Sequence, residues 1–264
     1  MTNVEKIAVQ RFGQDGLKLI NEVVAKECLV HIQMNDKRVS SLLASPEDLI
    51  DLALGHLAVE HGCRPDPSDI DASLTADNEE YTVIIRAETS IELTSRPTIV
   101  TSSCGACDHQ NLDDLVKRTP AVDDHELPVS LQTIIQALHD LRMQQPGFQE
   151  TGGMHAAGLY FGPESPSIVR EDIGRHNAVD KVLGHKLTTR PIDKPLALLL
   201  SGRCGWDIVS KAAHMNIPVI ASIGAASSLA VEAARASNMT LISFAKLDKA
   251  VVIGPVEGRF QRNH

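Results

Sequence analysis

Aromatic residues and long hydrophobic runs are scarce in this sequence of 264 residues. Aromatic side chains make up only 3% of the chain, so the core has to be built from aliphatic ones. The longest purely aliphatic run, Leu196 to Leu200, is too short to span a bilayer. The first twelve residues lack the apolar centre of a signal peptide, and we therefore expect a cytoplasmic protein without a membrane span.

An excess of basic charge and a dense set of cysteines are also missing. The net charge is −9, which argues against a nucleic-acid partner. Five cysteines, an odd number in a chain of this length, argue against a secreted disulfide framework and fit a reducing compartment. Hydrophobic residues make up 43%, enough for a packed core in one large domain or two small ones.

The first half of the chain predicts short strands and one helix. Residues 27–35 alternate apolar and polar side chains, which indicates a half-buried strand, and residues 38–44 form the expected return strand. Ser45-Pro46-Glu47-Asp48 is typical of a helix start. Further strands are expected over 81–86, 91–93 and 98–101, a loop over 64–71, and helices over 111–118 and 130–144.

The last third alternates strands and helices. Buried-type strands are expected over 196–200, 218–222 and 240–244, with helices over 205–215 and 227–236 between them. This βαβαβ rhythm predicts a parallel sheet with right-handed crossovers and therefore an α/β fold.

A Cys-x-x-Cys motif, Cys104 to Cys107, follows a β-branched run and precedes a polar stretch. Gly105 between the thiols adds no bulk and permits positive φ. A thiolate close to backbone N–H groups has a lowered pKa and is a nucleophile near neutral pH. The neighbours are small or polar, which favours reactive thiols over two buried hydrophobes.

Ser201, Gly202 and Arg203 stand where an expected parallel strand turns into a helix. Such turns lie at the sheet edge where α/β proteins bind ligands. Backbone N–H groups at a helix start attract anions, and Arg203 can contact a phosphate. A tight connection that binds nothing would need the same small residues, so both interpretations stay open.

Another polar block combines Arg170, Arg175 and His176 with a glycine within eight residues. Two arginines beside glycine suit a nucleotide, but a solvated turn before a helix has the same composition. The spacing alone does not choose between them.

His155 resembles the His of the His-x-Glu motif in zinc deaminases, but Ala157 stands where the catalytic glutamate would be. Those enzymes also need a Pro-Cys-x-x-Cys downstream, whereas the Cys-x-x-Cys here lies upstream. Zinc deaminase chemistry is therefore disfavoured. A structural zinc on the Cys-x-x-Cys pair lacks a second ligand pair and is not expected.

Together these segments resemble the formate dehydrogenase accessory sulfurtransferase family, FdhD. The resemblance covers nearly the whole chain in the family's order, and its most specific block runs from Arg170 to Lys181. The matching blocks are residues 102–107, 151–157, 170–181, 201–203, 211–213, 217–219 and 225–230.

The resemblance implies a sulfur carrier. Family members accept sulfur from a cysteine desulfurase as a persulfide on the first Cys of the motif, here Cys104. They pass it to the molybdenum (or tungsten) bis(molybdopterin guanine dinucleotide) cofactor before that cofactor enters the formate dehydrogenase apo-enzyme. This cofactor is then a bound substrate, and we expect no tightly bound metal of the protein's own.

The expected site residues follow from the resemblance and from the segments above. The catalytic residues are Cys104 and Cys107. The family's cofactor-binding stretch corresponds to residues 244–249. With the segments singled out above, the expected cofactor-binding set is Phe244, Ala245, Lys246, Leu247, Asp248, Lys249, Ser201, Gly202, Arg203, Arg170, Arg175, His176 and His155.

The resemblance also implies a fold and an assembly. It implies a cytidine-deaminase-like three-layer α/β domain over residues 127–264. A smaller N-terminal α+β domain over residues 1–126 carries the Cys-x-x-Cys loop at its end. Members of the family usually form a homodimer.

Two departures from the family pattern affect these expectations. Asp108 stands where the family commonly has Gly, and a neighbouring carboxylate raises the pKa of Cys107, so we expect Cys107 to be the secondary thiol. Cys204-Gly205-Trp206 replaces the usual apolar and small residues after Arg203. If the helix start after Arg203 helps to form the nucleotide pocket, we expect the Trp206 indole to lie in or beside that pocket.

Two alternative functions use the same residues. A thiol–disulfide redox protein would form a reversible Cys104–Cys107 disulfide and bind no nucleotide. A non-catalytic escort would bind the cofactor or the apo-enzyme without needing Cys104.

Overall fold

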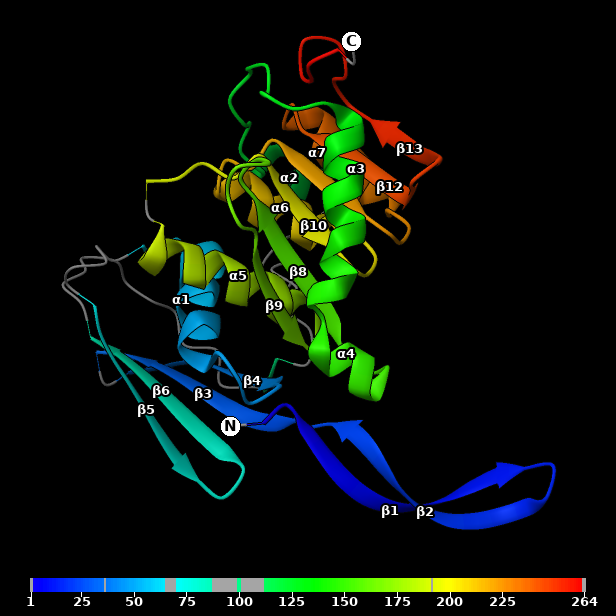
Figure 1. Ribbon diagram of the computed structural model, residues 1–264. Helices are drawn as coiled ribbons and strands as arrows, with labels where there is room; N and C mark the ends of the chain where they lie inside the picture. Colours follow the sequence, from blue (N-terminus) through cyan, green and yellow to red (C-terminus); the bar gives the residue numbers. More distant parts are fainter. Residues whose placement is uncertain are drawn as a thin grey trace.

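The structure is a computed structural model that describes residues 2–35, 37–64, 70–86, 99–100, 112–190 and 192–262. These residues form a mixed α/β protein with three sheets (Figure 1). The strands are β1 (Val4–Gly13), β2 (Gly16–Ala25), β3 (Cys28–Met34), β4 (Lys37–Ala44), β5 (Asp71–Asp77), β6 (Glu80–Arg86), β7 (Ile99–Val100), β8 (His155–Tyr160), β9 (Ile168–Asp172), β10 (Ala197–Leu200), β11 (Val219–Ser222), β12 (Thr240–Lys246) and β13 (Lys249–Ile253). The helices are α1 (Leu49–Glu60), α2 (Leu112–Arg118), α3 (Leu131–Asp140) with a 3-10 turn over Leu141–Gln144, α4 (Pro146–Thr151), α5 (Arg175–Thr189), α6 (Trp206–His214) and α7 (Ser228–Ala236).

The first sheet has the strand order β5-β6-β3-β4-β7 and packs against α1. Period-two alternation places Val30 and Ile32 of β3 in the core beside Val83 and Ile85 of β6. The buried side chains of α1 complete this small aliphatic core.

The second sheet has the order β13-β12-β11-β10-β8-β9. Strands β10, β11 and β12 are parallel, as their buried aliphatic sequences predicted, while β8, β9 and β13 are antiparallel to their neighbours. Leu198 and Leu200 face α5, α6 and α7, whereas Ala197 and Leu199 face α3. The sheet therefore lies between two helical layers (Figure 1). No helix of the described residues is long and apolar enough to cross a membrane.

The two larger sheets are joined by the crossing of α1 and α5. A Cβ atom on Gly55 would lie 1.8 Å from the carbonyl oxygen of Asp180, and one on Gly184 would lie 1.9 Å from that of Asp51. Only glycine permits the two helix backbones to approach this closely.

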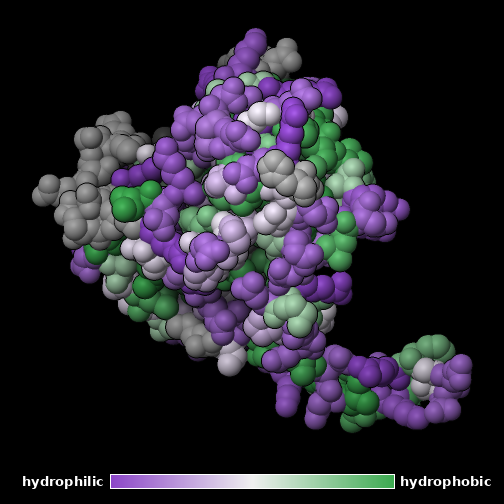
Figure 2. All heavy atoms as spheres, turned by 45° about the horizontal axis from the view of Figure 1, so that its top comes forward, coloured by the Kyte–Doolittle hydropathy of each residue, from purple (hydrophilic) through white to green (hydrophobic). Residues whose placement is uncertain are grey.

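Strands β1 and β2 form a hairpin of their own, which we call the arm. It extends away from the rest of the molecule (Figure 1). Apolar and polar residues both lie along its length (Figure 2). At its base, Asn3 Nδ2 donates to Glu47 Oε2 over 2.7 Å, and the Lys26 N–H donates to the Asn3 carbonyl over 2.8 Å.

Several expected boundaries were wrong for identifiable reasons. Helix α1 begins at Leu49 rather than within residues 45–48, because Ser45 bonds to the segment before α5 instead of capping α1. Pro146 starts α4 instead of only ending the helix before it, and Glu171 accepts hydrogen bonds from the Gly147 and Phe148 N–H groups. The arm, β5 and β13 had not been predicted at all, and the expected strand over 91–93 lies outside the described residues.

Candidate functional site

The carboxyl ends of β10, β11 and β12 meet in a narrow backbone turn. Gly224 follows β11, and its N–H donates to the Gly202 carbonyl oxygen over 3.2 Å. Ser222 Oγ donates to the same oxygen over 2.6 Å. A Cβ atom on Gly224 would lie 2.7 Å from that oxygen, so a larger residue would force the turn apart. The turn places residues 201–205 at the start of α6.

Two arginines and a histidine converge on this turn. A Cβ atom on Gly202 would lie 3.1 Å from His155 Nδ1 and 3.9 Å from Arg175 Cβ. Among the described residues, the buried Arg175 Nε has no hydrogen-bond partner and the exposed Arg203 forms no ion pair. Burial lowers the pKa of His155, and the charges of Arg175 and Arg203 lower it further.

Two helix starts reinforce this positive region. Gly174 is the N-cap of α5 and Gly205 that of α6, and neither start is capped by its own side chain. The N-terminal end of a helix favours negative charge. With Arg175 and Arg203, these ends form an anion-binding edge, by which we mean His155, Arg175, His176, Ser201, Gly202 and Arg203.

His176 and Asp207 form a buried ion pair between the starts of α5 and α6. Burial alone would raise the pKa of Asp207, but the hydrogen bond to His176 lowers it below its ordinary value. The carboxylate therefore fixes the imidazole beside the two arginines. Asp207 was missed in the sequence because an acid in the first turn of a helix is an ordinary feature.

The expected cofactor stretch, residues 244–249, lies at the end of β12 and the start of β13. The Phe244 N–H donates to the Gly224 carbonyl over 3.0 Å, which joins this hairpin to the anion-binding edge. Phe244 has a φ of 50°, which is unusual for a bulky residue, and its ring is exposed. Ala245 is buried, whereas Lys246 and Leu247 are exposed.

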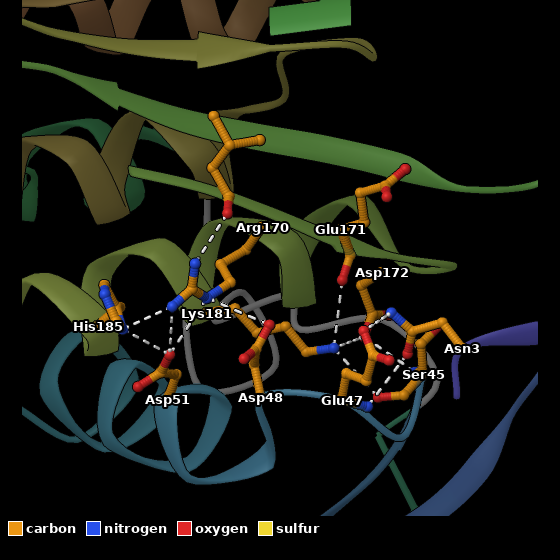
Figure 3. A network of polar contacts seen from close by, with 11 residues as sticks. Asn3, Ser45, Glu47, Asp48, Asp51, Arg170, Glu171, Asp172, Lys181 and His185 are labelled. Atoms are coloured by element: carbon orange, nitrogen blue, oxygen red, sulfur yellow. Dashed lines mark hydrogen bonds and ion pairs between the residues drawn. The ribbon is translucent and has the colours of Figure 1, made fainter. Parts of the chain in front are cut away.

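Arg170 does not lie at the anion-binding edge. Its Nε lies 3.2 Å from Asp48 Oδ2, and its guanidinium also contacts Asp51 and His185 (Figure 3). These partners belong to α1, the residue before it and α5. Its expected role in cofactor binding stays a prediction.

The rest of the most family-specific block is buried structure rather than a solvated turn. Asp172 lies 2.8 Å from Lys181 Nζ and accepts hydrogen bonds from the Ser45 N–H (Figure 3) and the Asn177 amide. Asp172 and Lys181 have no exposed surface. This block fastens the first sheet to α5.

Trp206 is only 9% exposed, so little of its surface is available to a ligand at the start of α6, and its expected place in or beside a nucleotide pocket stays a prediction. The indole is buried in the core, and its Nε1 lies 3.3 Å from both the Leu115 carbonyl and Thr119 Oγ1. The ring packs against α2 because an indole buries a large apolar area once its N–H has a partner. Burial also raises the pKa of the neighbouring Cys204 thiol far above its ordinary value.

Cys104 and Cys107 lie outside the described residues. The elements on either side of them are described: β7 pairs with β4 at Ser41 and Leu42, and α2 packs against Trp206 and α7. Chain segment 101–111 therefore connects the first sheet to a helix that packs on the start of α6.

Comparisons with known proteins agree with one another. The sequence model of the FdhD/NarQ family matches residues 25–257. A sulfur carrier protein FdhD from Nocardia farcinica is 33% identical over 84% of this chain and 83% of its own length. Another from Anaeromyxobacter dehalogenans is 33% identical over 86% of this chain and 85% of its own. A crystal structure from Desulfotalea psychrophila, assigned as a formate dehydrogenase accessory protein, has a TM-score of 0.78 at 24% identity, over 98% of this chain and 100% of that one.

Proposed function

The chain belongs to the FdhD/NarQ family, and from this membership and the geometry above we propose that it is a sulfur carrier for formate dehydrogenase. Its curated relatives have the name sulfur carrier protein. We assign the carrier thiol to Cys104 and a secondary role to Cys107. The source of sulfur is a cysteine desulfurase, and the formate dehydrogenase apo-enzyme is the recipient of the finished cofactor.

Loading is a thiol–persulfide exchange. The Cys104 thiolate attacks the terminal sulfur of the desulfurase persulfide, a new S–S bond forms, and the donor cysteine leaves as a thiolate. In delivery the S–S bond breaks: the reduced metal of the bis-guanine-dinucleotide cofactor, which is the substrate, would supply two electrons and take the terminal sulfur as sulfide, and Cys104 leaves as the thiolate. No outside oxidant is needed to load the carrier, since the sulfur arrives already bonded to sulfur.

The anion-binding edge supports the assignment of the substrate. Arg175 and Arg203 form no ion pair with any carboxylate of the described residues, and two helix starts with glycine N-caps lie beside them. A pyrophosphate supplies the negative charge that this arrangement lacks. The hairpin of residues 244–249 is joined to the same edge, where it can contact a guanine nucleotide. This unbalanced positive charge is the observation that carries the proposal.

Maturation of formate dehydrogenase in cells lacking the wild-type protein tests the carrier. We expect Cys104→Ala to abolish formate dehydrogenase activity and Cys107→Ala to leave part of it. Both variants must accumulate to the wild-type level. Full activity with Cys104→Ala would contradict the carrier and favour a cofactor escort. Equal loss in both variants, with a Cys104–Cys107 disulfide dominant in the wild type, would favour the redox alternative.

We also propose that the protein acts as a homodimer of two copies of this chain. The cytoplasm is the proposed site of action, since the desulfurase reaction and a reduced carrier thiol both need a reducing compartment.

A further inference from the structure

The arm plays no part in the site described above. The family match begins at residue 25, so residues 4–24 lie outside it. Strands β1 and β2 pair from Val4 with Ala25 to Gly13 with Gly16, and no third strand of the described chain joins them. An isolated two-stranded hairpin is only marginally stable in water. We therefore expect the arm to be stabilised by contact with another surface.

The two faces of the arm differ in how they are covered. Directly opposed residues share a face, so Val9 and Ile20 lie together on one side. The ion pair between Arg11 and Glu22 crosses that same side. Val9 and Ile20 are accordingly only partly exposed.

On the opposite face, no described residue covers the tip in this way. Phe12 is directly opposite Leu17, and Leu19 lies on the same face one pair further along. Their exposed fractions are 82%, 64% and 76%. We call these three residues the tip patch. Three large apolar side chains so exposed on one face are typical of a contact surface.

The charges on the arm indicate which partner fits. Residues 4–25 contain three basic and three acidic side chains, so the whole net charge of −9 belongs to the rest of the chain. Two such acidic bodies repel each other, whereas two neutral arms do not. The arm also carries both signs close to the tip patch, as in the ion pair of Lys18 with Asp15. These ion pairs close within one arm, so they leave no net charge to oppose a two-fold contact between two arms.

We propose that the tip patch of one chain packs face to face against the tip patch of a second copy of this chain. This contact is the interface of the homodimer proposed above, so the inference rests on that part of the proposed function. It buries the three apolar side chains of each copy and makes a four-stranded unit from two marginal hairpins. Its test involves neither nucleotide nor sulfur, so failure of this contact and failure of the sulfur-carrier function are separate results.

The first test measures the mass of the full chain in solution by light scattering or sedimentation over a wide range of concentration. We expect the wild type to be a dimer. The triple variant Phe12→Thr/Leu17→Thr/Leu19→Thr should raise its dissociation constant at least about 100-fold, since three apolar side chains lose their burial while strand propensity is kept. The matched control changes Met143 and Ile192 to Thr, because they are 80% and 89% exposed on the body. A monomeric wild type, or a dimer equally weakened by the control, would overturn the proposal.

The second test places a photo-cross-linking phenylalanine analogue at position 12. We expect a covalent dimer whose cross-linked peptides both come from residues 4–25. A cross-link to any other part of the second copy, or only within one chain, would overturn the arm-to-arm contact.

Discussion

The α1–α5 junction and the anion-binding edge are both rich in charge, but the charges are paired at the junction, whereas those of the edge arginines are unpaired within the described part of the chain. At the junction, Lys211 Nζ, which comes from the adjoining α6, lies 2.6 Å from Asp180 of α5 and 2.9 Å from Glu60 of α1, all in the interior. Burial alone would raise the pKa of Asp180, yet Lys211 and His56 lower it below its ordinary value. At the edge, by contrast, Arg175 and Arg203 have no such carboxylate among the described residues.

The difference separates structural charge from charge available to a ligand. Buried ions are tolerated only when they are paired, and removing one partner is costly. Unpaired positive charge near a surface attracts an anion from solution instead. The junction therefore keeps the first sheet in place, while the edge is free to bind.

The largest effect should come from breaking the junction. Lys211→Met should lower the free energy of unfolding by about 3–5 kcal/mol, because Asp180 and Glu60 lose their shared cation inside the protein. Urea denaturation measures this loss as a lower midpoint, provided that the slope of the unfolding free energy against urea concentration stays unchanged. The matched control is Lys194→Met, because the Lys194 side chain is 77% exposed and its Nζ lies 3.8 Å from Asp123 Oδ2. It should cost less than about 1 kcal/mol. Equal costs for the two variants would refute the structural role.

A smaller effect, in binding rather than stability, is expected at the edge. Arg175→Gln and Arg203→Gln should each weaken GDP binding by about 10–100-fold, since a charge-assisted hydrogen bond contributes about 1.5–3 kcal/mol. Calorimetric titration measures the affinity. Arg235→Gln, which removes the same charge from the exposed last turn of α7, should leave GDP binding unchanged. If Arg235→Gln weakens binding as much as the other two, only the net charge matters and no local site exists.

The smallest effect concerns pH. His155 has a pKa below its ordinary value of 6.5, so it is neutral at pH 7 and gains a proton only as the pH falls below 6.5. A bound anion favours the protonated form, so GDP affinity should increase as the pH falls through this window, by less than about tenfold. His155→Asn should remove this increase and leave only the titration of the nucleotide phosphate. An unchanged pH profile in the variant would place the nucleotide away from His155.

The parallel part of the second sheet was predictable because its signals are local. Strands β10, β11 and β12 have consecutive buried aliphatic residues, and the helices between them start at small or polar caps. Helix α3 begins after Ser130, whose hydroxyl accepts the Thr133 N–H as its sequence position suggests. Such features depend only on neighbours along the chain.

The remaining features depend on contacts that a sequence does not display. The arm has exposed residues on both faces, so its alternation does not mark an inner side. Asp172 and Lys181 belong to a block that resembles a ligand site, yet their partners are Ser45, each other and neighbouring groups of the same block. Trp206 was expected in or beside a pocket because it follows Arg203, whereas its burial depends on the packing of α2, which the sequence does not display. Residues 244–249 were identified only by resemblance.

The most direct test of the sulfur-carrier function is intact-protein mass spectrometry after incubation with a cysteine desulfurase and cysteine. We predict that the wild type gains the mass of one sulfur atom, that Cys107→Ala gains it in measurable amount, and that Cys104→Ala does not. Treatment with a reductant should remove the added mass. A sulfur adduct that persists in Cys104→Ala, or none in the wild type, would contradict Cys104 as the carrier.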